Sequence, residues 1–285
     1  MQEQEFSVAG RKISALLWGD RSGIPVLALH GWMDNAESFS VLAPQLVGCH
    51  VLAPDLAGHG RSDHRSADGE YNLWSDLPDL LAIVDEMGWK AFLLVGHSRG
   101  ALIARLLAAA LPERVCALVL LDAFAPPPAS AEDCPQQLAD YLRDHRRLHG
   151  RRIGVFSTIE QAIAVRVGKG MEPEVAEPIV MRNLEQFTGG WRWRMDARLA
   201  GASAFKLTEE HNRAINKRLT MPVSLFTGQG GYGRYLVTPD LQDLGIIAEQ
   251  LEGSHHFHME AASSVVARRI LDLPALREAS QCASA

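Results

Sequence analysis

The sequence predicts an α/β fold: a mostly parallel central sheet with helices on both faces and an inserted helical cap. Three observations predict it. Short apolar runs bounded by turn residues alternate with helical patterns along most of the chain. The alternation stops between about residues 124 and 215, where helical patterns follow one another. Finally, the stretch LLVGHSRGAL joins an apolar run directly to an Ala- and Leu-rich helical pattern, as a tight strand-to-helix turn does.

The expected elements follow from these patterns. Residues 72–88 carry leucines and a valine at helical spacing, with Asn72 as a candidate N-cap and Gly88 as a candidate stop. Two further helices are expected in residues 101–112 and 265–273. The expected strands cover residues 12–18, 25–29, 50–54, 91–96, 116–122, 222–228 and 246–251.

The break in the alternation predicts the domain organisation. It begins at the APPP stretch of residues 125–128, a natural exit from a sheet. The chain returns to strand-like sequence at Pro222. We therefore expect a core formed by residues 1–123 and 216–285, with residues 124–215 inserted as a helical cap.

Composition narrows the function classes. The 285 residues are 47% hydrophobic and 22% charged, and the net charge of −6 favours neither nucleic acid nor an anionic membrane. No apolar run approaches the roughly 20 residues that a membrane span needs, and the N-terminal stretch lacks the pattern of a signal peptide. The four cysteines show no metal-binding spacing, which favours thiols in a reducing cytoplasm. We expect a cytoplasmic protein with no cofactor and no metal.

The stretch Gly-His-Ser-Arg-Gly predicts a nucleophile. A strand-to-helix turn this tight forces Ser98 into a strained backbone conformation, and Gly96 and Gly100 remove side chains that would collide beside it. The hydroxyl is then exposed at the carboxyl edge of the sheet, where open α/β sheets bind ligands. The N-terminal end of the following helix favours an oxyanion there.

These motifs resemble those of the α/β-hydrolase fold superfamily, and more narrowly its serine-hydrolase-like branch. LALHGWMDNAESF (27–39) resembles the family's His-Gly loop, DLAGHGRSD (55–63) its D-x-x-G-x-G-x-S segment, and GSHHFHME (253–260) its histidine loop. The resemblance implies an oxyanion hole made by the backbone N–H groups of Trp32 and Arg99. It also implies structural roles for His30 and His97.

The histidine loop offers three candidate bases, His255, His256 and His258. In the family pattern the catalytic histidine lies two residues after the glycine, which selects His255 after Gly253. A metal site built from the three imidazoles is the competing interpretation, but no cysteine or carboxylate at ligand spacing accompanies them.

The carboxylate that completes a Ser-His-acid triad is harder to identify. In the family it usually lies in the turn after a late strand, but here that stretch reads LFTGQGGYGR and contains four glycines and no carboxylate. Asp122 ends the preceding apolar strand, on the same sheet edge as Ser98, and some relatives carry their acid there. The order Ser98, Asp122, His255 also fits the family. Asp240 or Asp243, or a weak or absent acid, remain the alternatives.

The sequence therefore predicts a serine hydrolase that acts on an ester-like small molecule, with Ser98, His255 and Asp122 as catalytic residues. The alternative is a ligand-binding protein with little or no activity, favoured only by the glycine-rich turn. Trp32, Trp191 and Trp193 are candidate pocket residues. The arginines of residues 143–152 are interpreted as a solvated helix face rather than a site for an anionic substrate.

Overall fold

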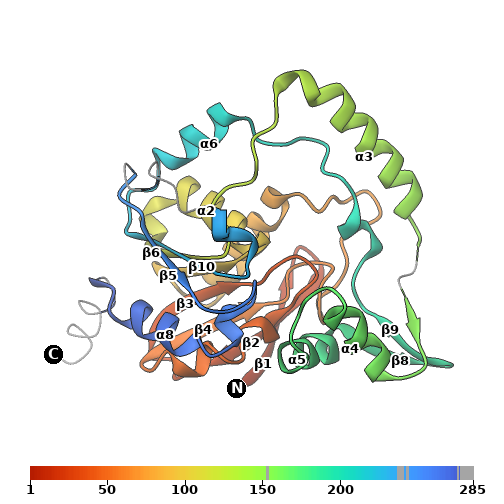
Figure 1. Cartoon of the computed structure of the whole chain (residues 1–285), viewed down its shortest axis with the longest axis horizontal. Coiled ribbons are helices and arrows are strands. Elements are labelled where there is room, and N and C mark those ends of the chain that lie inside the picture. Colours follow the sequence, from red (N-terminus) through yellow and green to blue (C-terminus); the bar gives the residue numbers. More distant parts are fainter. Residues whose placement is uncertain (152–153, 236–240, 242–243, 275, 277–285) are drawn as a thin grey trace.

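A central sheet of eight strands forms the body of the protein (Figure 1). The structure is a computed structural model that describes residues 1–151, 154–235, 241, 244–274 and 276. The strand order is β1-β2-β4-β3-β5-β6-β10-β11; β2 pairs antiparallel with β1 and β4, and the other neighbours are parallel. The strands are β1 (Gln2–Val8), β2 (Arg11–Trp18), β3 (Ile24–Leu29), β4 (Cys49–Pro54), β5 (Phe92–His97), β6 (Val115–Leu121), β10 (Val223–Gly228) and β11 (Ile247–Leu251).

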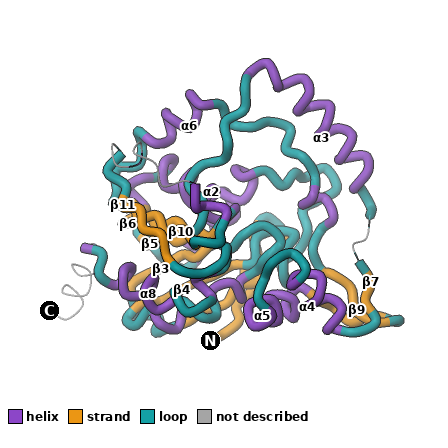
Figure 2. Tube along the Cα trace, viewed as in Figure 1, coloured by secondary structure: helices purple, strands orange, loops and turns teal. Residues whose placement is uncertain are grey.

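Helices cover both faces of this sheet, because its inner strands are buried on both sides (Figure 2). One face packs against α1 (Leu77–Glu86) and α2 (Arg99–Ala110), and the other against α8 (Ser263–Leu271). Successive residues of a strand point to opposite faces, so Leu27 of β3 joins the first cluster and Val26 the second. The prediction of a mostly parallel sheet with helices on both faces is confirmed.

A long segment between β6 and β10 contributes no strand to the central sheet. In the view of Figure 1 its helix α3 borders the upper right of the molecule, and α4 and α5 lie at the lower right. The segment contains the helices α3 (Cys134–Leu148), α4 (Ile159–Val167), α5 (Pro173–Asn183) and α6 (Glu209–Asn216), and the strands β7 (Val155–Phe156), β8 (Leu184–Phe187) and β9 (Gly190–Trp193).

Two predictions about elements need correction. The chain begins with β1, an edge strand that pairs with β2, although its QEQE start carried no strand pattern. The segment expected to be purely helical holds a small antiparallel sheet in the order β7-β9-β8. Its strands of two to four residues are too short to show a period of two, and GWRW mixes aromatic and charged residues. The boundaries 124 and 215 stay a prediction.

Two arginines of the stretch 143–152 form ion pairs on the exposed surface of α3. Arg143 pairs with Asp140 at 2.7 Å and Arg147 with Asp144 at 2.8 Å, each one helical turn apart. These side chains face solvent, which agrees with the interpretation as a solvated helix face. Among the helices of the described residues, none combines the length and apolar character needed to cross a membrane.

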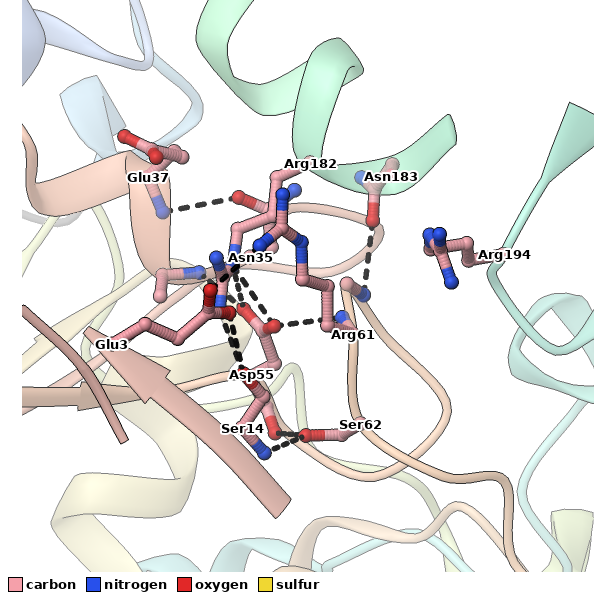
Figure 3. A network of polar contacts seen from close by, with 12 residues as sticks. Glu3, Ser14, Asn35, Glu37, Asp55, Arg61, Ser62, Arg182, Asn183 and Arg194 are labelled. Atoms are coloured by element: carbon pink, nitrogen blue, oxygen red, sulfur yellow. Dashed lines mark hydrogen bonds and ion pairs between the residues drawn. The ribbon is translucent and has the colours of Figure 1, made fainter. Parts of the chain in front are cut away.

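A buried ion pair joins the inserted segment to the central sheet (Figure 3). Arg182 of α5 is 4% exposed, and its Nε lies 2.9 Å from both carboxylate oxygens of Asp55. Its Nη2 atom lies 3.0 Å from Ser14 Oγ on β2 and 3.0 Å from a carboxylate oxygen of Glu3 on β1. Burial acts to lower the pKa of Arg182, but Asp55 and Glu3 outweigh it and raise that pKa above its usual value.

The same carboxylate organises the D-x-x-G-x-G-x-S turn. Asp55 accepts hydrogen bonds from the backbone N–H groups of Ala36, at 2.8 Å, and Arg61, at 2.7 Å. Ser62 Oγ donates to the Asp55 carbonyl at 2.6 Å. Gly60 has a φ of 50°, and a Cβ there would lie 2.3 Å from the Asp55 carboxylate. The motif spacing therefore builds a binding site for this carboxylate, and through Ala36 the carboxylate also holds the later part of the His-Gly loop.

Replacement of Arg182 by Met should destabilise the protein by about 3–5 kcal/mol, because it leaves the charge of Asp55 buried without its cationic partner. The measurement is urea unfolding followed by fluorescence and circular dichroism. Arg143→Met on the exposed face of α3 is the matched control, with an expected change within about 0.5 kcal/mol. Equal unfolding midpoints for the two variants would contradict a stabilising role for the buried pair.

Candidate active site

Ser98 lies at the sharp turn between β5 and α2, with φ 51° and ψ −118°. A non-glycine residue at positive φ is strained, and neighbouring backbone must hold it there. The Ser98 N–H donates to the Leu121 carbonyl at 2.9 Å. A Cβ on Gly100 would lie 2.1 Å from the Leu29 carbonyl oxygen, and one on Gly96 only 2.5 Å from that of Gly100. The two glycines therefore let the turn pack against β3 and α2.

The carboxylate of Asp122 lies in the glycine-rich turn after β10. Asp122 follows β6 directly and also has a positive φ, 58°. Its Oδ1 accepts from the Gly228 N–H at 3.0 Å and its Oδ2 from the Tyr232 N–H at 2.8 Å. The side chain of Asp122 is fully buried, and Oδ2 also lies 2.5 Å from Nδ1 of His255.

This position explains why the turn after β10 carries glycine instead of an acid. A Cβ on Gly231 would lie 2.3 Å from Oδ1 of Asp122, and a Cβ on Gly233 would lie 2.8 Å from the same atom. A Cβ on Gly228 would meet the Ser254 carbonyl oxygen at 2.2 Å. The carboxylate from β6 thus fills the space that side chains of the turn would otherwise use.

His255 lies in the loop that follows β11. Glu260 shapes this loop: its carboxylate accepts from the Ser254 N–H at 2.9 Å and from the Ser254 hydroxyl. His97 supports it from β5, because its Nε2 lies 2.9 Å from the His255 carbonyl oxygen. The His255 ring also contacts Tyr232, with ring centroids 4.6 Å apart. The imidazole is thereby held with Nδ1 toward the carboxylate.

The two proposed oxyanion donors have backbone N–H groups without a protein acceptor among the described residues. The Trp32 indole N–H donates to the Leu199 carbonyl at 2.8 Å, which ties the His-Gly loop to the inserted segment. The Arg99 side chain turns away from this region and donates to Asp76 at 2.9 Å and to the Tyr71 carbonyl at 3.2 Å. Only the backbone of Arg99 is therefore available to a ligand near Ser98.

A cavity of about 300 Å³ brings the predicted residues together. Ser98, His255 and Trp32 line it, but no hydrogen bond of the Ser98 hydroxyl is present among the described residues. Trp191 and Trp193 are not among the residues that line this cavity, so their role as pocket residues stays a prediction. Both lie on β9, where Trp193 is buried and Trp191 partly buried in an apolar cluster that also includes Met33 of the core. The other lining residues are Met33, Asp34, Arg166, Lys169, Gly170, Met171, Gly230, Tyr232, Ser254 and His256.

Asp34 is a buried carboxylate in the wall of this cavity that the sequence analysis did not single out. Its Oδ2 lies 3.0 Å from Nε2 of His256 and 3.6 Å from Nδ1 of His97, and its Oδ1 accepts from Arg166 of α4. Burial acts to raise the pKa of Asp34, but His256, Arg166 and His97 hold that pKa well below its usual range. Burial, reinforced by the neighbouring histidines, lowers the pKa of His97 well below its usual value.

Two other histidines of the motifs make structural hydrogen bonds. His30 accepts from the Leu56 N–H at 2.9 Å through Nε2, and its Nδ1 lies 2.8 Å from the Gly31 carbonyl oxygen. His258 is buried beside the Ser38 hydroxyl at 3.1 Å. The alternative acids Asp240 and Asp243 lie outside the described residues.

The fold and this geometry define the class of protein. A family model described as the alpha/beta hydrolase fold matches residues 24–149. The structure superposes on that of a hypothetical protein from Pseudomonas aeruginosa PAO1 with a TM-score of 0.88 and 37% identity, covering 98% of this chain and 100% of that one. The chain belongs to the α/β-hydrolase fold family.

Within that family the chain is similar to proteins named as serine hydrolases and esterases. A serine hydrolase-like protein of Dictyostelium discoideum is 28% identical, covering 90% of this chain and 76% of that protein. An esterase of Mycobacterium tuberculosis is 29% identical, covering 85% and 78%. The thioesterase domain of the curacin biosynthetic pathway superposes with a TM-score of 0.82 and 25% identity, covering 96% of this chain and 99% of the domain.

Gly231→Ala should destabilise the protein by about 1–3 kcal/mol, because the added methyl group overlaps the Asp122 carboxylate. Gly230→Ala in the same turn is the control, since its nearest contact would be 3.2 Å, to the Gly253 carbonyl oxygen. Thermal unfolding of both variants measures the difference. A Gly231→Ala protein as stable as the Gly230→Ala protein would show that the carboxylate does not need this space.

Proposed function

We propose that this protein is a serine hydrolase that cleaves an ester-like small molecule, a carboxylic ester or a thioester, through an acyl-enzyme on Ser98. The observation that carries the proposal is the contact at 2.5 Å between the buried Asp122 carboxylate and Nδ1 of His255, a residue that lines the same cavity as Ser98. A buried carboxylate on Nδ1 leaves Nε2 of the imidazole as a base, which is the task of the acid in such triads.

In the acylation step, Nε2 of His255 takes the proton of the Ser98 hydroxyl as Oγ attacks the substrate carbonyl carbon. The negative charge that develops on the carbonyl oxygen is stabilised by the N–H groups of Trp32 and Arg99. The protonated imidazole is stabilised by Asp122, which keeps its own charge. The imidazolium then gives its proton to the departing alcohol or thiol, which leaves the acyl group on Ser98.

In the deacylation step, water repeats the chemistry of the serine. His255 removes a proton from the water as its oxygen attacks the acyl carbon, and the same two N–H groups stabilise the second oxyanion. Collapse of this intermediate breaks the bond to Ser98 Oγ, which recovers its proton from the imidazolium. The products are a carboxylic acid and the free enzyme, and no cofactor enters either step.

We also propose that residues 124–215 act as a cap that determines the shape of the substrate cavity. Arg166, Lys169 and Met171 of this segment contribute to the cavity wall. The Trp32 indole and the Arg182–Asp55 pair tie the segment to the core at two separate places. Substrate selection therefore depends on residues of the insertion, whereas the reacting groups come from the sheet edge.

Fluorophosphonate labelling tests for an activated serine. The wild-type protein should form a covalent adduct, because His255 makes the Ser98 hydroxyl nucleophilic, and Ser98→Ala should form none. Intact-protein mass spectrometry measures the adduct, and Ser40→Ala, directly after the short 3-10 helix Ala36–Phe39, is the control that should label like the wild type. No adduct on the folded wild-type protein would favour the alternative, a ligand-binding protein without activity.

Asp122→Asn should lower ester turnover by about 10²–10⁴-fold with substrate binding largely intact, because the amide no longer stabilises the imidazolium. A screen of p-nitrophenyl esters of graded chain length first identifies a substrate, and kcat and KM are then measured on it. Full activity in Asp122→Asn, together with loss of activity in Asp240→Asn, would move the acid to the other candidate.

A further inference from the structure

The inference begins with an unpartnered nitrogen of His97. Nε2 of His97 faces the His255 carbonyl oxygen at 2.9 Å, and because a carbonyl only accepts, Nε2 carries the ring proton. Nδ1 is then left with a lone pair. This atom is buried and has no hydrogen-bond partner among the residues that the structure describes, and it lies 3.6 Å from Oδ2 of Asp34, another acceptor. The buried lone pair of Nδ1 thus faces a carboxylate oxygen instead of a donor, and a cation between the two atoms supplies the partner that Nδ1 lacks.

A second imidazole faces the same carboxylate oxygen. Nε2 of His256 lies 3.0 Å from Oδ2 of Asp34, and single donor atoms of Asp34, His97 and His256 all lie within 4.8 Å of one another. Zn²⁺ binds nitrogen and oxygen ligands at about 2.0–2.2 Å, so two ligands of a tetrahedral ion lie roughly 3.4 Å apart. The two separations from Asp34, 3.0 and 3.6 Å, bracket that value, whereas the three donor atoms together span up to 4.8 Å, so binding an ion requires the imidazoles to turn toward each other.

We propose that Asp34, His97 and His256 form a binding site for a divalent transition-metal ion of the Zn²⁺ class. Two imidazoles and one carboxylate favour such ions over Mg²⁺ and Ca²⁺, which prefer sites built from oxygen ligands. Asp34 and His256 line the active-site cavity, so the ion exchanges with solvent through it and a water molecule completes the coordination. Gly31 leaves room for the site, since a Cβ there would lie 2.9 Å from Oδ2 of Asp34 and 3.0 Å from Nδ1 of His97.

The surrounding charges indicate an exchangeable ion. Arg166 contacts Oδ1 of Asp34, so the metal uses Oδ2 without breaking that ion pair. The guanidinium charge nevertheless opposes a second cation and lowers the affinity. Since His97 also contacts the backbone of His255, occupancy of this site bears on the position of the proposed base.

Co²⁺ binding tests the proposal, because tetrahedral Co²⁺ absorbs visible light and stands in for Zn²⁺. Titration of the full, untagged chain should give a one-to-one visible spectrum that added Zn²⁺ abolishes. His256→Gln and Asp34→Asn should each weaken Co²⁺ binding by at least about tenfold, as loss of a ligand requires. His64→Gln, which changes a half-exposed histidine elsewhere, is the control that should bind like the wild type.

The outcomes separate this site from the proposed hydrolase. The titration is repeated in Ser98→Ala, which lacks the nucleophile but keeps all three ligands and should bind Co²⁺ normally. Circular dichroism confirms that each variant is folded. No visible spectrum with the wild type, or equal binding by the wild type, His256→Gln and Asp34→Asn, overturns the metal site whatever the fluorophosphonate result.

Discussion

The carboxylate of Asp122 is the group on which the rest of the site depends. It is fully buried, and three donors converge on it: two backbone N–H groups of the turn after β10 and the imidazole of His255. These contacts tie the ends of β6 and β10 to the loop after β11. A buried charge is tolerated only when such bonds compensate its loss of water, so the carboxylate and the turn stabilise each other.

A second buried carboxylate attaches the inserted segment to the central sheet. Asp55 binds Arg182 of the inserted segment and the N–H group of Ala36, in the later part of the His-Gly loop. The position of the inserted segment is therefore mechanically linked to the loop that carries Trp32. Asp34 also links the inserted segment to the core, because its carboxylate contacts both Arg166 of α4 and His256 of the histidine loop. Of the three buried carboxylates, Asp34 lines the cavity itself, whereas Asp122 contacts it through His255.

The sequence predicted the parts of this protein that depend on local pattern. The strand-to-helix turn at Ser98 is set by glycines two residues away on each side, so a short motif specifies it. Asp122 and His255 were expected on one sheet edge because parallel strands end there, and the structure brings them into contact. The partners in the Arg182–Asp55 pair are 127 positions apart and those in the Arg166–Asp34 pair 132 positions apart. No rule of sequence spacing predicts contacts over such distances. The sequence did not predict the short strands β7, β8 and β9 for a related reason. Their strand conformation depends on pairing with each other and not on a pattern within each strand.

The limited space around the Asp122 carboxylate restricts where in this site an acid can be placed. The carboxylate of Asp122, at the end of β6, and a side chain at position 231 would occupy the same space, because a Cβ on residue 231 would lie 2.3 Å from Oδ1 of Asp122. The protein can hold either the Asp122 carboxylate or a side chain at position 231 in this space, but not both. Moving the acid from position 122 to position 231 therefore requires two substitutions together, glycine for Asp122 and aspartate for Gly231, because the space does not hold both side chains.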